Sequence, residues 1–237
     1  MEKLREYAKE YGILLSEEQL NQFHTYYEML IEKNKVMNLT AITEKEDVMV
    51  KHFADSIAVA SCYDFVNQEV SLIDVGTGAG FPGIPLKIAF PNLKVTLLDS
   101  LNKRVSFLQD VIDELQLEDI QAVHFRAEDG AKKVEFREQF DICVSRAVAN
   151  LASLSEYCLP FVKVGGYFIS YKSGEIEEEL ESAKKAISVL GGSVAKVDYL
   201  NLCQMDYMRS FVGIRKEKQT PKKYPRKAGL PTKEPIM

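Results

Sequence analysis

The chain has 237 residues, of which 46% are hydrophobic and 27% charged, and its formal net charge is −5. This composition is typical of a soluble globular protein and excludes a chain that is basic throughout. The charged, helical start MEKLREYAKE excludes a signal peptide, and no apolar run reaches the roughly 18 residues that a membrane span needs. We expect a cytoplasmic protein with no membrane association, built from one α/β domain and a smaller appendage.

Residues 1–66 are predicted to be helical. Ser16, followed by Gln19, is typical of a helix start, and a second start is expected at Thr43. No glycine or proline occurs between Ile13 and Val75, which favours helices over strands. The apolar residues at helical spacing form two groups: Leu20, Phe23, Tyr27, Leu30 and Ile31, then Val48, Phe53, Ile57 and Ala60.

Short apolar runs alternate with amphipathic stretches from residue 70 onward, within a domain assigned to residues 67–216. The expected strands are 70–75, 93–99, 121–125, 140–145, 165–171, 193–200 and 209–215. The expected helices are 83–89, 101–117, 127–134, 150–161 and 175–190. This alternation predicts a mostly parallel, seven-stranded α/β sheet covered on both faces, with the last two strands forming an antiparallel edge hairpin.

The run IDVGTGAGFPG, residues 73–83, follows the first expected strand. In open α/β sheets ligands bind at the carboxyl ends of the strands, and Gly76 and Gly78 let the backbone approach a ligand closely. The Lys-Ser or Lys-Thr of a triphosphate loop is missing, and Phe81 replaces the third glycine of a dinucleotide fingerprint. Asp74 suits a cationic ligand such as S-adenosylmethionine, although a structural turn carboxylate is the alternative.

Three further positions follow the next strands. Asp99 ends the second strand, where an acid is expected to meet ribose hydroxyls, with a helix N-cap as the alternative. Glu128, after the third strand, is expected to read the adenine edge or to cap a helix. Arg146, after the fourth, is expected at the mouth of the crevice, with a plain salt bridge as the alternative. Together these features predict a class I, Rossmann-like S-adenosylmethionine methyltransferase.

The motifs that the sequence lacks reduce the number of possible methyl acceptors. The motif of exocyclic-amine methyltransferases, [DNS]PP[YFW], is replaced by SRAVAN after the fourth strand. The four cysteines (Cys62, Cys143, Cys158 and Cys203) show no CxxC spacing and no activating histidine, which indicates reduced thiols, no metal site and no cysteine nucleophile. An acceptor with a free lone pair, such as guanine N7, needs no general base, so no catalytic residue is assigned.

Residues 217–237 form a basic, proline-rich tail. Between Arg215 and Lys233 there are eight basic residues and one acid. Such a segment suits contacts with RNA phosphates, and Tyr224 could stack on a base. The alternative is a disordered, solvated tail. The candidate RNA-binding residues of the tail are Lys222, Lys223, Arg226 and Lys227.

The chain strongly resembles, over nearly its whole length, the glucose-inhibited division protein B family of bacterial methyltransferases, which modify guanine N7 in small-subunit (16S) ribosomal RNA. The matching motifs are NKVMNLTAI (34–42), KHFADS (51–56), IDVGTGAGFPGIPL (73–86), TLLDSLNKRVSFL (96–108), SRA (145–147), YKSG (171–174) and YPRKAGLPTKEP (224–235). His52 and Asp55, which lie in the second motif, are interpreted as a structural pair.

The resemblance implies S-adenosylmethionine as cofactor, with a pocket formed by Gly76, Phe81, Ala127, Glu128 and Arg146. It also implies RNA or target-base contacts by Arg126, Lys172, Arg209 and the tail, with Arg146 helping to hold the guanine. A surface salt bridge is the alternative for Lys172.

The expected partner is small-subunit ribosomal RNA or the small ribosomal subunit, bound by a monomer. Two other hypotheses stay open: a non-catalytic S-adenosylmethionine-binding RNA module, and a small-molecule methyltransferase whose activity does not need residues 218–237.

Overall fold

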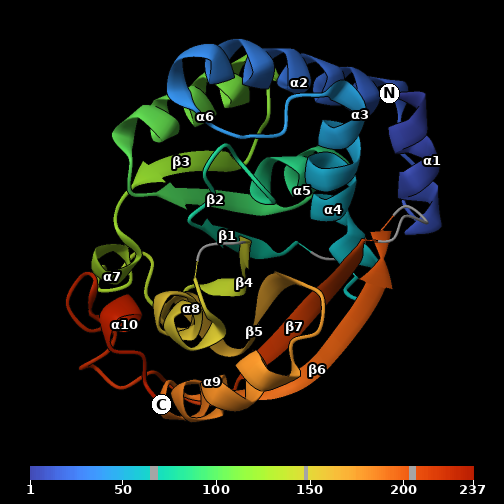
Figure 1. The fold of residues 1–237 in the computed structure, drawn as a ribbon. Helices are drawn as coiled ribbons and strands as arrows, with labels where there is room; N and C mark the ends of the chain where they lie inside the picture. The colour runs from blue at the N-terminus through green and yellow to red at the C-terminus, as the bar shows by residue number, and fades with distance from the viewer. Residues whose placement is uncertain (65–68, 147–148, 203–206) are drawn as a thin grey trace.

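A computed structural model describes residues 1–64, 69–146, 149–202 and 207–237 (Figure 1). The expected boundary between residues 66 and 67, Ala147 of the SRA motif and Cys203 lie outside these ranges. The described residues form a seven-stranded sheet of order β3-β2-β1-β4-β5-β7-β6. The strands are β1 (Ser71–Val75), β2 (Lys94–Asp99), β3 (Ile120–His124), β4 (Phe140–Arg146), β5 (Val162–Ser173), β6 (Gly192–Asn201) and β7 (Met208–Lys216).

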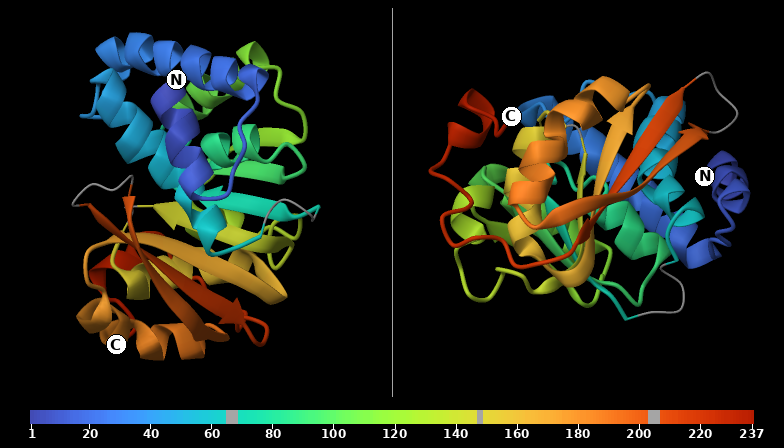
Figure 2. Two further views of the ribbon diagram at one scale, coloured as in Figure 1. Left: turned by 90° about the vertical axis from the view of Figure 1, so that its right-hand side faces the viewer. Right: turned by 90° about the horizontal axis from the view of Figure 1, so that it is seen from below.

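Strand directions confirm the predicted sheet. β1 to β5 pair in parallel, whereas β7 runs antiparallel to both β5 and β6. Side chains of a strand alternate between faces, so neighbouring residues enter different layers. Leu72 belongs to the apolar core that includes residues of α2, α5 and α6, and Ile73 belongs to the core that includes residues of α8 and α9. Both faces are therefore covered, as the views in Figures 1 and 2 show.

The N-terminal helices are α1 (Glu2–Glu10) and α2 (Glu17–Met37). The Oγ of Ser16 accepts from the Gln19 backbone, while the Gln19 side chain accepts from the Ser16 backbone, which confirms the capping pattern. The buried stripe of α2 includes Tyr26, and Tyr27 is only half-buried. The predicted stripe was therefore one residue off at this turn.

Residues 45–61 form one helical run that changes its winding. It consists of α3 (Lys45–Val48), a π-helical stretch (Met49–Ala54), α4 (Asp55–Ile57) and a 3₁₀ turn (Ala58–Ser61). The run starts two residues later than Thr43. Val48, Phe53 and Ile57 are fully buried as predicted. π turns often mark functional sites, and this one carries His52 toward the end of β4.

The helices of the α/β part are α5 (Gly83–Ala89), α6 (Asn102–Glu114), α7 (Ala127–Gly130), α8 (Leu151–Cys158), α9 (Glu177–Val189) and α10 (Leu230–Lys233). α5 and α6 lie against β2 with α2 outside them, while α8 lies against β4 and β5. α7 ends at Gly130 and is shorter than the predicted 127–134, and the residues after it form turns in which Ala131 is buried and Val134 is 84% exposed. α8 gives way to a 3₁₀ turn at Leu159, just before Pro160.

Both ends of the chain pack onto the sheet domain. Gln19 and Gln22 of α2 donate to the carbonyls of Ile88 and Leu115 at distances of 2.7 and 3.0 Å. The C-terminal residues run over α7 and α8 and lie far from α1 and α2 (Figure 1). Among the described helices, none is long and apolar enough to cross a membrane.

Candidate functional site

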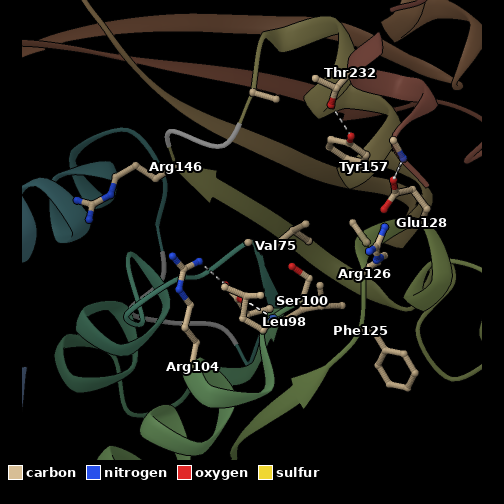
Figure 3. A pocket seen from close by; sticks show the side chains of 16 residues that line it. Val75, Leu98, Ser100, Arg104, Phe125, Arg126, Glu128, Arg146, Tyr157 and Thr232 are labelled. Carbon is tan, nitrogen blue, oxygen red and sulfur yellow. Dashed lines mark hydrogen bonds and ion pairs between the residues drawn. The ribbon is translucent and has the colours of Figure 1, made fainter. Parts of the chain in front are cut away.

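A pocket of about 580 Å³ lies at the carboxyl ends of β1, β2, β3 and β4 (Figure 3). Each of these strands contributes to its lining through Gly76, Asp99, Ala127 or Arg146, which stand at or just after its last residue. This is where an open α/β sheet binds its ligand, and the volume is in the usual range for a small-molecule site.

The glycine turn after β1 has a backbone that only glycine adopts readily. Gly76, Gly78 and Gly80 have φ angles of 73°, 63° and 106°. Gly76 N donates to the carbonyl of Leu98 at 2.9 Å, which fastens the turn to β2. A Cβ on Gly78 would meet no atom within 4 Å, so the turn faces open space there. Gly78 itself is not among the residues that line the pocket.

Asp74 lies beneath the glycine turn instead of facing the pocket. Its Oδ2 accepts from Thr77 Oγ1 at 2.6 Å and from Gly83 N at 2.8 Å, and its side chain is fully buried. Burial raises the pKa of this carboxyl to about 6. Because Asp74 is not among the lining residues, direct contact with a cationic ligand is the wrong interpretation, and Asp74 is a structural turn carboxylate.

Asp99 joins the turn, the next helix and the pocket. Its Oδ2 accepts from Gly78 N and its Oδ1 from Leu101 N, both at 2.9 Å, and Arg104 Nη1 lies 3.5 Å from Oδ2. The N-cap of α6 is Leu101, so the alternative hypothesis that Asp99 is the helix N-cap is wrong, although Asp99 holds the backbone of the capping residue. Each carboxylate oxygen has two lone pairs, so acceptor capacity remains for ribose hydroxyls.

Arg126, Ala127 and Glu128 form the wall that follows β3, and all three line the pocket. Arg126 is exposed at the rim, whereas Glu128 is 6% exposed. The Oε1 of Glu128 accepts from Gly229 N at 2.9 Å. The C-terminal tail therefore reaches this wall.

Arg146 lines the pocket at the end of β4 and is held from several sides. Its Nη1 donates to Asp55 Oδ2 at 2.7 Å, and its Nη2 lies 3.3 Å from His52 Nδ1. The guanidinium lies 5.0 Å from the centroid of the Phe81 ring. Phe81 does not line the pocket; it stacks on His52 and supports Arg146. The salt bridge and the pocket position predicted as alternatives for Arg146 therefore both occur.

Asp55 is a member of the site that sequence reasoning underrated. Its fully buried carboxylate accepts from Arg146, and also from Arg209 Nε at 2.5 Å and Nη2 at 2.7 Å. Arg209 is only 6% exposed, so its guanidinium is committed to Asp55 and does not lie on an RNA-facing surface. The sequence feature that could have indicated this role is the acid inside the apolar stretch FADSIAVA. An acid in such a stretch is expected to be buried, and a buried carboxylate needs a cationic partner.

The other RNA-binding candidates fall into two groups. Lys172 pairs with Glu179 at 2.6 Å, as its alternative interpretation predicted, and Arg226 pairs with Glu156 at 2.7 Å. The exposed group on the tail is Lys222, Lys223 and Lys227.

The lining residues that were not assigned to the site from the sequence include Arg104, Tyr157, Gly229 and Thr232. Tyr157 lies on α8, and the last two lie in the tail. Arg104 lies in the matching motif 96–108, and Gly229 and Thr232 lie in the matching motif 224–235, but neither motif assigned these residues to the pocket.

The fold and pocket define a class I S-adenosylmethionine methyltransferase. Similar solved structures include P. horikoshii TYW2 in complex with MeSAdo (TM-score 0.55, 16% identity, covering 69% of this chain and 62% of that chain). M. jannaschii TYW2 in complex with AdoMet is also similar (TM-score 0.52, 16% identity, covering 64% and 71%). At these identities the likeness concerns the fold.

The family model described as rRNA small subunit methyltransferase G (GidB) matches residues 19–206, so the chain belongs to this family. A Staphylococcus aureus (strain Newman) protein named ribosomal RNA small subunit methyltransferase G is 54% identical over 237 residues, covering 100% of this chain and 98% of that protein. A Lachnoclostridium phytofermentans protein of the same name is 54% identical over 226 residues, covering 95% and 93%.

S-adenosylmethionine is the cofactor of this class, and the pocket fits it. The Gly76 backbone allows close approach, Asp99 has spare acceptor capacity for ribose hydroxyls, and Glu128 stands beyond β3 where adenine is expected. The open space that faces Gly78 is consistent with a ligand lying over the turn.

Proposed function

We propose that this protein transfers a methyl group from S-adenosylmethionine to N7 of a guanine in 16S ribosomal RNA of the small subunit. The observation that carries the proposal is the 54% identity over the full 237 residues to a protein named ribosomal RNA small subunit methyltransferase G. The pocket supports it, since Gly76, Asp99, Ala127, Glu128 and Arg146 all line one cavity.

The bound cofactor supplies an electrophilic methyl group. Guanine N7 carries an in-plane lone pair and no proton, so the protein has to position the base and exclude water but not to remove a proton. Burial and the charge of Arg146 lower the pKa of His52 to about 4, so at neutral pH His52 lies beside Arg146 as a neutral imidazole. Arg146 is suited to donate to O6 of the guanine, a common guanine contact of arginine.

The RNA-facing surface in this proposal includes Arg126 at the pocket rim and the exposed tail lysines Lys222, Lys223 and Lys227. Lys172, Arg209 and Arg226 contribute by positioning, because each is held in an ion pair. We infer that the protein works as a monomer in the cytoplasm, where its ribosomal substrate is assembled.

The experiment is methyl transfer from labelled cofactor to small subunits and naked 16S RNA from cells that lack the protein. Label at N7 of one guanine, mapped by borohydride and aniline cleavage, is expected. Label on an exocyclic amine or a ring carbon would refute the N7 assignment. Absence of transfer to RNA and to complete or incomplete subunits, with cofactor binding intact, would favour a non-catalytic binding module.

A variant and a salt series distinguish the proposed RNA methyltransferase from a small-molecule methyltransferase. Asp99→Asn is expected to lose transfer by weakening cofactor binding, because it removes the charged acceptor that also holds Gly78. Methylation of free nucleosides that is indifferent to salt would favour a small-molecule methyltransferase, since RNA binding weakens steeply as salt rises.

A further inference from the structure

Residues 220–233, here called the C-terminal strap, cross α7 and α8 and end at the pocket (Figures 1 and 3). The strap is fastened at its start. Thr220 N donates to Glu138 Oε1 at 2.7 Å, and Arg137 donates to the carbonyls of Thr220 and Tyr224 at 2.8 and 3.0 Å. The alternative interpretation of a disordered, solvated tail is therefore wrong for these residues.

The middle of the strap is held by a buried acid. Glu156 on α8 has a 1% exposed side chain, and it accepts from the backbone N of Arg226 at 2.7 Å and from its guanidinium at 2.7 and 3.0 Å. Ser153, also on α8, donates to the carbonyl of Pro231 at 2.7 Å. A buried carboxylate without its cation is costly, so α8 is built to hold the strap in place.

The end of the strap forms part of the pocket wall. Gly229 N donates to Glu128 Oε1 at 2.9 Å, and Tyr157 Oη lies 2.7 Å from Thr232 Oγ1. All four residues line the pocket. Figure 3 shows Thr232, Tyr157 and Glu128 together on one side, with Arg146 on the other.

We propose that the strap is part of the cofactor site and that cofactor binding depends on its docking, with or without RNA. The strap orients Glu128 through Gly229 and, with Tyr157, presents hydroxyls to the adenosine part of the cofactor. The side opposite Arg146 suits this part if the methyl group is delivered beside Arg146. The inference rests on the cofactor and on that part of the proposed function, but not on which RNA atom is methylated.

Isothermal titration of full-length variants with S-adenosylmethionine, without RNA, tests the inference. Thr232→Val removes one hydroxyl and keeps the side-chain shape, and Ser153→Ala removes an anchor of the strap. Each is expected to raise the Kd about three- to tenfold, the effect of one lost hydrogen bond. Lys233→Ala, an exposed change on the same strap at a residue with no assigned role, is the matched control and should leave the Kd unchanged. Thermal melts check that the variants are folded.

A wild-type Kd in both variants would overturn the proposal, as would weakened RNA binding with unchanged cofactor binding, which would make the strap an RNA contact alone. Hydrogen exchange gives a second readout. The Gly229 amide, which donates to Glu128, should exchange more slowly when cofactor is added, and an unchanged rate contradicts the proposal. Failure of methyl transfer to RNA would refute the proposed function and leave these binding results standing.

Discussion

Three side chains hold Arg146 in position. Two of them come from the helical run 45–61 and one comes from the glycine turn after β1. Asp55 supplies the counter-charge, Phe81 the flat apolar support, and His52 a neutral ring whose Nδ1 lies 3.3 Å from Arg146 Nη2. Thr40 Oγ1 lies 2.8 Å from His52 Nε2. The Nδ1 of His52 lies 3.3 Å from Arg146 Nη2 and 3.1 Å from the Lys51 carbonyl oxygen, so both ring nitrogens have polar partners that fix the orientation of the ring.

His52 is expected to make the free energy of unfolding depend on pH. Its pKa is about 4 in the folded protein and ordinarily 6.5, so between these values the unfolded chain binds a proton that the native state does not. The His52 contribution to stability therefore falls as pH drops from 6.5 toward 4, by up to about 1.4 kcal/mol per pH unit. Urea denaturation of the wild type and His52→Gln at pH 7, 6 and 5 measures it.

The comparison with His52→Gln is needed because Asp74 changes the free energy of unfolding with pH in the opposite direction to His52. Its pKa is raised from 3.8 to about 6 in the folded protein, so Asp74 adds stability as pH falls through that window. The advantage of wild type over His52→Gln should shrink between pH 7 and pH 5. An equal advantage at both values would show that His52 is not held neutral.

At the scale of elements, helix α2 closes over the glycine turn. Tyr26 Oη donates to the carbonyl of Ala79 at 2.5 Å in a fully buried position. A Cβ on Gly80 would lie 2.6 Å from the hydroxyl oxygen of Tyr26, so the position of α2 also requires glycine at residue 80. The N-terminal region therefore shapes the turn that underlies the cofactor.

Tyr26→Phe is expected to lower the free energy of unfolding by about 1–3 kcal/mol, because the Ala79 carbonyl loses its buried donor. Weaker cofactor binding should accompany the loss, since the glycine turn is less firmly held. Denaturation and titration calorimetry measure the two effects. Tyr27→Phe is the matched control: its hydroxyl makes an exposed 3.4 Å contact with Thr43 and should matter little. Equal effects of the two variants would contradict the role of Tyr26.

At the scale of the whole molecule, we expect RNA binding to depend on where the basic residues lie and not on the net charge of −5. The exposed lysines of the strap stand on a chain segment that also reaches the pocket, so RNA held there would lie near the cofactor. The N-terminal helices α1 and α2 lie far from the strap (Figure 1).

Replacing Lys222, Lys223 and Lys227 together by alanine should weaken RNA binding and flatten its salt dependence. Each lost phosphate contact lowers the slope of log K against log salt by about 0.7–0.9, so a change of about 2 is expected for three lysines. Fluorescence anisotropy between 50 and 200 mM KCl, as a rough working range, measures it. Alanine at the exposed Lys9, Lys35 and Lys45 removes the same charge elsewhere. Matching slopes for the two triple variants would exclude the strap as an RNA contact.

Local chain chemistry was enough to predict the sheet and the core of the site. Apolar runs of strand length alternating with amphipathic stretches specify a parallel sheet, and the carboxyl ends of its strands meet at one edge. Gly76, Asp99, Glu128 and Arg146 each follow a strand, so their positions in the chain already place them together at that edge.

Contacts between distant segments were decided only by the tertiary structure. Asp74 turns under the glycine loop because the amide of Gly83 meets it there, and Arg209 is withdrawn from the surface by Asp55. The strap reaches Glu128 because a buried acid on α8 holds it in place. Sequence patterns record which face a residue presents along its own element. They do not record which charged side chain from another element will pair with that residue. This pairing decides whether a cation lies exposed on the surface or is buried where it supports the site.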